Sequence, residues 1–107
     1  MTFTLTRVPG SAIHFEQLNI GNGMVASIQA SHFHYSNPRC DNLSSDDYTH
    51  FEVALLMNGR WFHPDRDTRF MDCQWASYWN EYDDVAAQVP RRSIEQMLSS
   101  LGEAFSN

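Results

Sequence analysis

Histidines and cysteines are the residues of this sequence with the most versatile chemistry. His32 and His34 lie two apart, so they would share one face of a strand, and such a pair with one further ligand can hold zinc. The candidates for that ligand are Cys40, His50 and His63. No second ligand pair has metal-like spacing, so a His/Cys metal site is kept only as an alternative and no cofactor is predicted.

Nucleophilic and acid–base chemistry also lack a recognisable pattern. Neither Cys40 nor Cys73 stands in a cysteine-protease signature or a nucleophile elbow. The adjacent acids Asp46-Asp47 and Asp83-Asp84 stand in polar stretches, where neighbouring carboxylates are typically solvated. Because no set of residues meets the requirements of a catalytic site, we predict that the protein is not an enzyme.

The charge of the chain is more informative. There are 13 Asp and Glu against seven basic residues, all of them arginine, for a formal net charge of −6. This balance disfavours direct binding to nucleic acid, which requires basic charge to displace counterions. It is compatible with the opposite role, in which the protein covers a basic surface on a nucleic-acid-binding protein. Acidity alone is also typical of an ordinary soluble protein.

The acids gather in three stretches without helical periodicity: Asp41, Asp46 and Asp47; Asp65, Asp67 and Asp72; and Glu81, Asp83 and Asp84. Loops at one rim of a sheet would bring these stretches together as a single anionic patch. Such a patch would suit an arginine-rich protein surface, because carboxylates pair with guanidinium groups.

Aromatic residues stand beside the last of these acidic stretches, in the segment YWNEYDD. Trp75 and Trp79 are four apart and are predicted to form the buried stripe of a short helix. Tyr78 and Tyr82 would lie on a neighbouring face, where large aromatic surfaces suit a protein partner. The predicted partner-binding residues are therefore Asp46, Asp47, Asp65, Asp67, Tyr78, Glu81, Tyr82, Asp83 and Asp84.

A hairpin around Asn58-Gly59 is the strongest local signal for the elements that must position these residues. Residues 49–57 and 60–63 are rich in β-formers, and Asn-Gly between two such runs favours a two-residue type I′ turn. The turn fixes the cross-strand neighbours, which are Leu56–Trp61, Leu55–Phe62 and Ala54–His63. The residues expected to share the core face are Phe51, Val53, Leu55, Met57 and Phe62. We predict that this hairpin is the centre of the sheet.

Weaker patterns predict the other strands. Phe3 and Leu5 alternate with threonines over residues 2–8, and a second hairpin would join 13–20 to 24–34 through Gly21-Asn22-Gly23, with glycine at a positive φ. A helix over part of 24–34 is the alternative. The remaining expectations are a short strand at 84–89 and polar loops at 36–48 and 64–74.

An amphipathic helix is predicted after Pro90. Its apolar residues follow the i, i+3, i+4, i+7 pattern and are Ile94, Met97, Leu98, Leu101 and Phe105. Ser93 and Gln96 fit a capping box at its start. Arg91 and Arg92 oppose the helix dipole there, so we expect them to bond to acids elsewhere in the domain or to reach a partner.

Together these elements predict an α+β fold, with a mainly antiparallel β-sheet and a C-terminal amphipathic helix packed on one face. The length suits one globular domain over residues 1–107. The longest apolar run, 53–57, is far shorter than the ~20 residues that span a bilayer. No signal-peptide pattern opens the chain, so we expect a cytoplasmic protein.

In size, charge and organisation the chain resembles the small acidic proteins of bacteriophages and mobile elements, including anti-CRISPR inhibitors. The features that carry the resemblance are the hairpin FEVALLMNGRWFHPD, the acidic and aromatic segment, and the closing helix PRRSIEQMLSSLG. The resemblance implies a protein without catalysis or cofactor that blocks a host complex, such as a CRISPR–Cas nucleic-acid-binding subunit. The modest net charge favours specific surface blocking over DNA mimicry. The alternatives are a homodimeric accessory protein and a small metal-binding protein.

Overall fold

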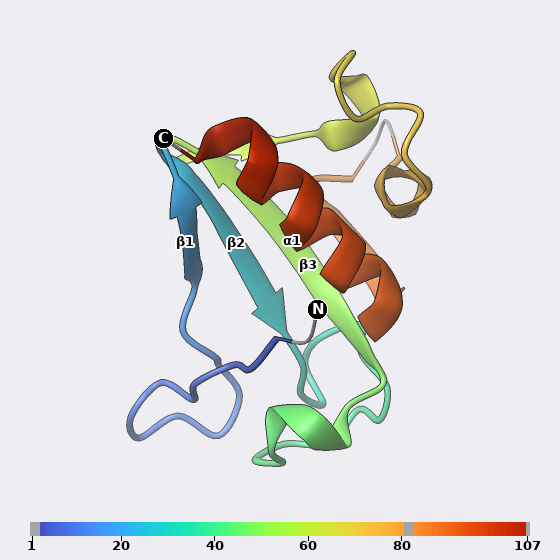
Figure 1. The fold of residues 1–107 in the computed structure, drawn as a ribbon. Coiled ribbons are helices and arrows are strands. Elements are labelled where there is room, and N and C mark those ends of the chain that lie inside the picture. Colours follow the sequence, from blue (N-terminus) through green and yellow to red (C-terminus); the bar gives the residue numbers. More distant parts are fainter. Residues whose placement is uncertain (1–2, 81–82, 107) are drawn as a thin grey trace.

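The computed structural model describes residues 3–80 and 83–106 and has an α+β fold, which confirms the predicted class. One antiparallel sheet carries the helix α1 across one of its faces (Figure 1). The elements are β1 Leu18–Gly21, β2 Met24–Gln29, β3 His50–Met57, β4 Arg60–Phe62, β5 Val85–Pro90 and α1 Arg91–Phe105, with 3-10 turns η1 Ser45–Asp47, η2 Pro64–Arg66 and η3 Gln74–Tyr78. No helix in the described part of the chain is long and apolar enough to cross a bilayer.

Strand β3 is the centre of the sheet, whereas β4, the other strand of the hairpin predicted to be central, lies at its edge. Strand β3 pairs with β2 along one edge, while β4 and β5 share its other edge end to end. Phe62 of β4 lies opposite Leu55, and Val85 of β5 lies opposite the next residue, Ala54. The 63–84 segment therefore leaves one edge of β3 and returns to the same edge. Its ends are joined by a hydrogen bond of 2.9 Å between His63 Nε2 and Asp84 Oδ1.

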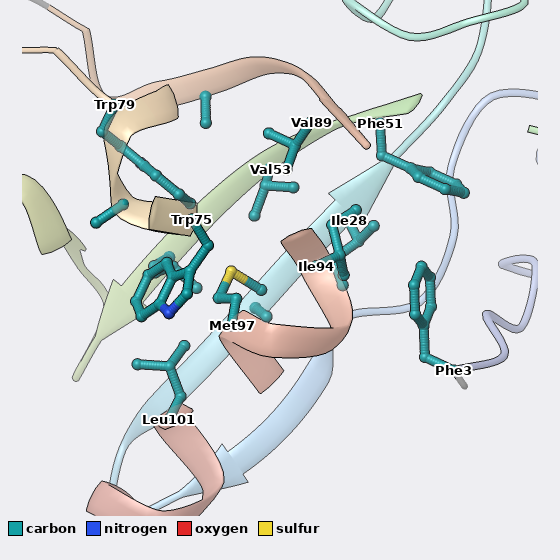
Figure 2. Close-up of a cluster of buried hydrophobic side chains, with 14 of the residues drawn as sticks. Phe3, Ile28, Phe51, Val53, Trp75, Trp79, Val89, Ile94, Met97 and Leu101 are labelled. Atoms are coloured by element: carbon teal, nitrogen blue, oxygen red, sulfur yellow. The ribbon is translucent and has the colours of Figure 1, made fainter. Parts of the chain in front are cut away.

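The core lies between the sheet and α1 (Figure 2). Alternate residues of β3 point toward α1, and the helix presents a stripe at helical spacing, because the two elements bury side chains with periods of two and 3.6. The buried members of these rows are Phe51, Val53, Leu55, Ile94, Met97, Leu101 and Phe105. Trp75 of η3 and Trp79, which directly follows η3, close one side of this core and are each 3% exposed. Their predicted inward orientation is confirmed, although the segment forms a 3-10 turn and not the predicted short helix.

Both predicted hairpin turns are present. Asn58 and Gly59 have φ of 51° and 80°, as a type I′ turn requires. In the Gly21-Asn22-Gly23 turn, the Asn22 amide donates to the Phe105 carbonyl at 2.6 Å, and a Cβ on Gly21 would lie 2.7 Å from the same oxygen. This turn therefore caps the C-terminal end of α1, and only glycine allows so close an approach.

The N-terminal expectations were wrong in three places, of which the first is β1, since it begins at Leu18 and not at residue 13. Residues 3–8 form no strand, since the Leu5 N–H bonds to Ser45 Oγ, and only an isolated bridge joins Arg7 to Phe15. Strand β2 ends at Gln29, well before residue 34. The reason is that the Gln29 side-chain amide makes both backbone bonds to Phe15, at 2.7 and 2.9 Å, where a strand would use its main chain. The alternative helix over 24–34 does not form.

Two further local predictions were wrong. Ala54 pairs with Val85 and not with His63, because β4 ends at Phe62. The Ser93–Gln96 capping box does not form either, since α1 already begins at Arg91. Ser93 is buried inside the first turn and its hydroxyl lies 3.2 Å from Gln74 Oε1 of η3.

The unfavourable position of Arg91 at the start of the helix dipole is compensated, because its side chain turns back toward η1 and β3. Its guanidinium donates to the carbonyls of Ser45 and Tyr48, the latter at 3.1 Å. It also lies over the rings of Phe3 and Phe51, at 4.8 and 5.2 Å. A single side chain thus ties the start of α1 to η1, to the N-terminal segment and to β3.

Candidate protein-binding surface

The predicted acidic residues do not gather into one patch. Asp41, Asp46 and Asp47 precede β3, the last two in η1, whereas the described acids of the other two stretches lie in the 63–84 segment beside β4 and β5 (Figure 1). The part of β3 from His50 to Ala54 alone spans about 13 Å. This exceeds the screening length of about 8 Å in physiological salt, so a partner would meet the two groups as two separate negative patches.

Two predicted acids of the 63–84 segment, Asp65 and Asp67, are half-buried. Both carboxylate oxygens of Asp67 accept from the Arg69 guanidinium, at 3.0 and 2.9 Å. These bonds hold the pKa of Asp67 below its usual value. Asp65 is half-buried, and its Oδ1 has no hydrogen-bond partner. Neither side chain is well placed to meet a partner.

Asp83 and Asp84 reach solvent, as does Asp72 of the second acidic stretch. Asp84 is 53% exposed on its side chain even though it accepts from His63, and exposed Asp83 accepts from the Asn80 amide at 2.7 Å. Both immediately precede Val85, so they lie at the start of β5. Tyr78 is half-buried against the core and offers less surface than predicted. Glu81 and Tyr82 lie outside the described residues.

The sheet face opposite α1 is more unusual than any acidic cluster. This face, called the open face below, carries Val25, Ser27, Glu52, Ala54, Leu56, Trp61 and Val85, and the uncharged polar residues Asn19, Gln29 and His50 share the same side of the sheet at its margins. Trp61, Leu56 and Val25 form one row across three strands, and Trp61 is 51% exposed. Antiparallel sheets normally turn polar residues to this side, yet Glu52 is the one charged member of the set. Depletion of charge around an aromatic residue is typical of protein interfaces.

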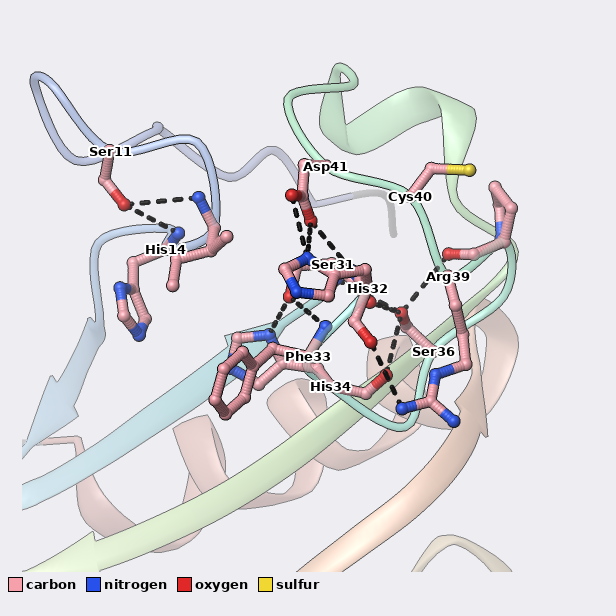
Figure 3. A network of polar contacts seen from close by, with 12 residues as sticks. Ser11, His14, Ser31, His32, Phe33, His34, Ser36, Arg39, Cys40 and Asp41 are labelled. Carbon is pink, nitrogen blue, oxygen red and sulfur yellow. Dashed lines mark hydrogen bonds and ion pairs between the residues drawn. The ribbon is translucent and has the colours of Figure 1, made fainter.

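A tightly bonded loop stands at one end of the open face (Figure 3). Ser36 Oγ accepts from the Ser31 N–H at 3.2 Å and donates to its carbonyl at 3.1 Å, which closes the loop. Inside it, Ser31 Oγ lies 2.7 Å from His34 Nδ1 and accepts from the Phe33 N–H at 2.9 Å. Phe33 at the tip is 70% exposed. Ser31 itself is fully buried, so its pair with His34 holds the loop and is closed to a substrate.

A bulge in β5 fixes this loop to the sheet. Ala87 and Gln88 together oppose the single residue Glu52, and Gln88 adopts φ of 52°. The backbone N–H of Gln88 donates to the Tyr35 carbonyl at 3.0 Å, and its side-chain amide donates to the Ser36 carbonyl at 2.9 Å. From β3, the Glu52 carboxylate accepts from the Tyr35 N–H at 2.9 Å. No local pattern predicts this bulge, because left-handed backbone is uncommon outside glycine.

The histidines do not form the predicted strand-face pair, because β2 has ended before they begin. The imidazole of His32 bonds to the Asp41 carboxylate at 2.7 Å, and its backbone N–H donates to the same group at 2.8 Å. Both contacts lower the pKa of Asp41. Among residues 3–80 and 83–106, no three His, Cys, Asp or Glu side chains are arranged to hold a metal ion. The cysteines in this part of the chain, Cys40 and Cys73, are free thiols.

The environment of His34 predicts a loss of stability in mild acid. Burial lowers its pKa below 6.5, and the nearby His14 and His32 lower it further, against the opposing effects of Glu52 and Asp41. Below pH 6.5 the unfolded chain therefore takes up this proton more readily than the folded chain. The free energy of unfolding should fall as the pH drops below 6.5 and should not change through this group above it.

Urea unfolding at pH 7.5 and pH 5.0 tests this prediction. His34→Asn keeps an oxygen where Nδ1 meets Ser31 but cannot titrate, so the variant should lose less stability between the two pH values than the wild type does. An equal loss in both proteins would assign the acid sensitivity to other groups.

No match to this chain was found among protein-family models, curated proteins or solved structures.

Proposed function

We propose that this protein is a non-catalytic inhibitor, encoded by a phage or mobile element, that binds a nucleic-acid-binding defence complex in the bacterial cytoplasm, as anti-CRISPR proteins do. The observation that carries the proposal is the open face, which is poor in charge and has a half-exposed tryptophan at its edge. Tryptophan is enriched among the residues that dominate binding energy at protein interfaces. No direct contact with nucleic acid is required.

The acidic side chains beside this face indicate what kind of surface it meets. Asp83 and Asp84 lead directly into Val85, so two exposed carboxylates border the apolar rows at the β5 end. A partner with an apolar patch edged by arginine or lysine would satisfy both features. Basic surfaces of this kind are what nucleic-acid-binding proteins present to phosphate groups.

A homodimer that packs two open faces together is the alternative, and the charge of the chain opposes it. Two copies would bring together net charges of −6 each. An unlike, basic partner is therefore the better fit.

Charge reversal at two matched aspartate pairs tests the location of the surface. Asp83→Lys with Asp84→Lys should weaken capture of the partner from bacterial lysate by at least about tenfold, which corresponds to about 1.4 kcal/mol. Asp46→Lys with Asp47→Lys changes the net charge equally but lies about 13 Å or more away along β3, so binding should change by less than about threefold.

Each variant should first be shown to unfold at the wild-type midpoint, since Asp84 also pairs with His63. Equal losses in the two variants would indicate that only net charge matters, and a larger loss at η1 would move the interface away from the open face. Sedimentation of the protein alone tests the alternative: a concentration-dependent dimer that Trp61→Ala abolishes would replace the proposed function.

A further inference from the structure

We infer that the 31–36 loop is a second anchor of the same interface, and that Phe33 enters an apolar recess on the protein that contacts Trp61. The inference rests on the proposed function and adds to it the shape and polarity of the partner. Phe33 and Trp61 are two of the most exposed large apolar side chains in the described structure, and both border the open face.

The 31–36 loop is preorganised in the free protein, because hydrogen bonds within it hold its conformation. Its two ends are closed by the Ser31–Ser36 bonds, and the Phe33 N–H is held by the buried Ser31 hydroxyl. The Phe33 ring also contacts the imidazoles on either side of it, with centroids 5.6 Å from His32 and 6.5 Å from His34. Binding would therefore order few additional side chains, which lowers the entropic cost of association.

Phe33 of the loop and Trp61 are close enough for one partner protein to contact both. Tyr35 bonds to Glu52, while Trp61 stands opposite Leu56 on the same strand. These two positions on β3 are about 13 Å apart. A standard interface buries about 800 Å² on each partner, a patch roughly 30 Å across, and therefore covers both. Figure 3 shows the loop in front of the sheet with α1 behind it.

The two ends of the surface differ in charge. At the β5 end, exposed Asp83 and Asp84 call for basic groups on the partner. At the loop end, Asp41 already accepts from His32 and Glu52 from the Tyr35 N–H, while Arg39 lies over the Tyr35 ring at 5.3 Å. Both of these carboxylates are half-buried, whereas Asp83 and Asp84 are exposed. The partner is therefore a protein with an apolar recess at one end of its surface and arginine or lysine at the other.

Site-specific photo-crosslinking tests this assignment even though the partner is unidentified. The photoreactive residue p-benzoyl-phenylalanine replaces Phe33, Trp61 or Met71 in separate proteins, which are irradiated in bacterial lysate. Met71 is the matched control, because it is 51% exposed but follows Phe70, which packs on Phe105 of α1 at the other side of the sheet. Positions 33 and 61 should crosslink to the same protein, with competition by excess unlabelled wild type, and position 71 should not.

A crosslink at 61 without one at 33 would overturn the inference and leave the proposed function standing. Absence of a competed crosslink at both positions, or equal labelling from position 71, would overturn the two together.

Affinity for the crosslinked protein supplies a second readout. Phe33→Ala should weaken binding at least tenfold with an unchanged unfolding midpoint, because the side chain is already in solvent. Gln88→Gly retains the phenyl ring and tolerates φ of 52°, but it removes the amide that holds Ser36, so it should weaken binding by a smaller factor. Met71→Ala should have no effect. Unchanged affinity of Phe33→Ala would overturn the inference.

Discussion

Replacing Trp75 by alanine is expected to lower the free energy of unfolding by about 3–5 kcal/mol, the range for removing a buried aromatic side chain. The indole is 3% exposed, packs against the rings of Phe70 and Trp79, and donates from Nε1 to Ser100 Oγ at 3.3 Å. Its loss would leave a cavity where η3 meets α1. Since small domains are stable by only about 5–15 kcal/mol, this variant should be close to unfolding at physiological temperature.

Trp61→Ala is the matched control, because it makes the same chemical change on the open face. It should change the free energy of unfolding by about 0.5–1 kcal/mol at most, as expected of a half-exposed side chain. Urea unfolding followed by circular dichroism measures both variants, with equal slopes against urea as the check on two-state behaviour. Similar losses in the two proteins would mean that Trp61 belongs to the core and would remove it from the proposed interface.

The second large effect is expected at the start of α1. Arg91→Met should lower the free energy of unfolding by about 2–3 kcal/mol, because it removes charged donors from the carbonyls of Ser45 and Tyr48. It also removes the cation from the rings of Phe3 and Phe51. Thermal and urea unfolding would measure this loss, and proteolysis near η1 should accelerate because that turn loses its link to the helix.

Arg92→Met provides the control at the neighbouring position. Arg92 is exposed, and removing either arginine should relieve the helix dipole to a similar extent. Stability of Arg92→Met should therefore be unchanged or slightly raised. If Arg91→Met behaved in the same way, the guanidinium contacts would carry no net energy.

The parts of the fold that were predicted correctly from the sequence depend on neighbouring residues. Asn58-Gly59 determines its own turn, and the spacing from Ile94 to Phe105 determines which side of α1 is buried. The end-to-end arrangement of β4 and β5 was not predicted, because it joins residues separated by the whole 63–84 segment. The end of β2 was also missed, since nothing local shows that the Gln29 side chain will bond to Phe15.

For the candidate surface too, only the features set by neighbouring residues were predicted from the sequence. The register Leu56–Trp61 was predicted, yet the face that it belongs to is recognisable only once β2 and β5 contribute Val25 and Val85. The acids were found by composition, which cannot show that η1 and the 63–84 segment lie at different places along β3. Whether a charged or aromatic residue is available to a partner depends on tertiary contacts, and these contacts remove Asp67 and much of Tyr78.

The bulge at Gln88 has a consequence for how this protein can evolve. The contacts that hold the 31–36 loop on the sheet end on main-chain atoms, namely the N–H and carbonyl of Tyr35 and the carbonyl of Ser36. Main-chain atoms are common to all amino acids, so the side chains at positions 33 and 35 can be exchanged without altering the support beneath them. Mutation can therefore change the side chains at the tip, and with them the specificity of the proposed interface, without altering the contacts that hold the loop on the sheet.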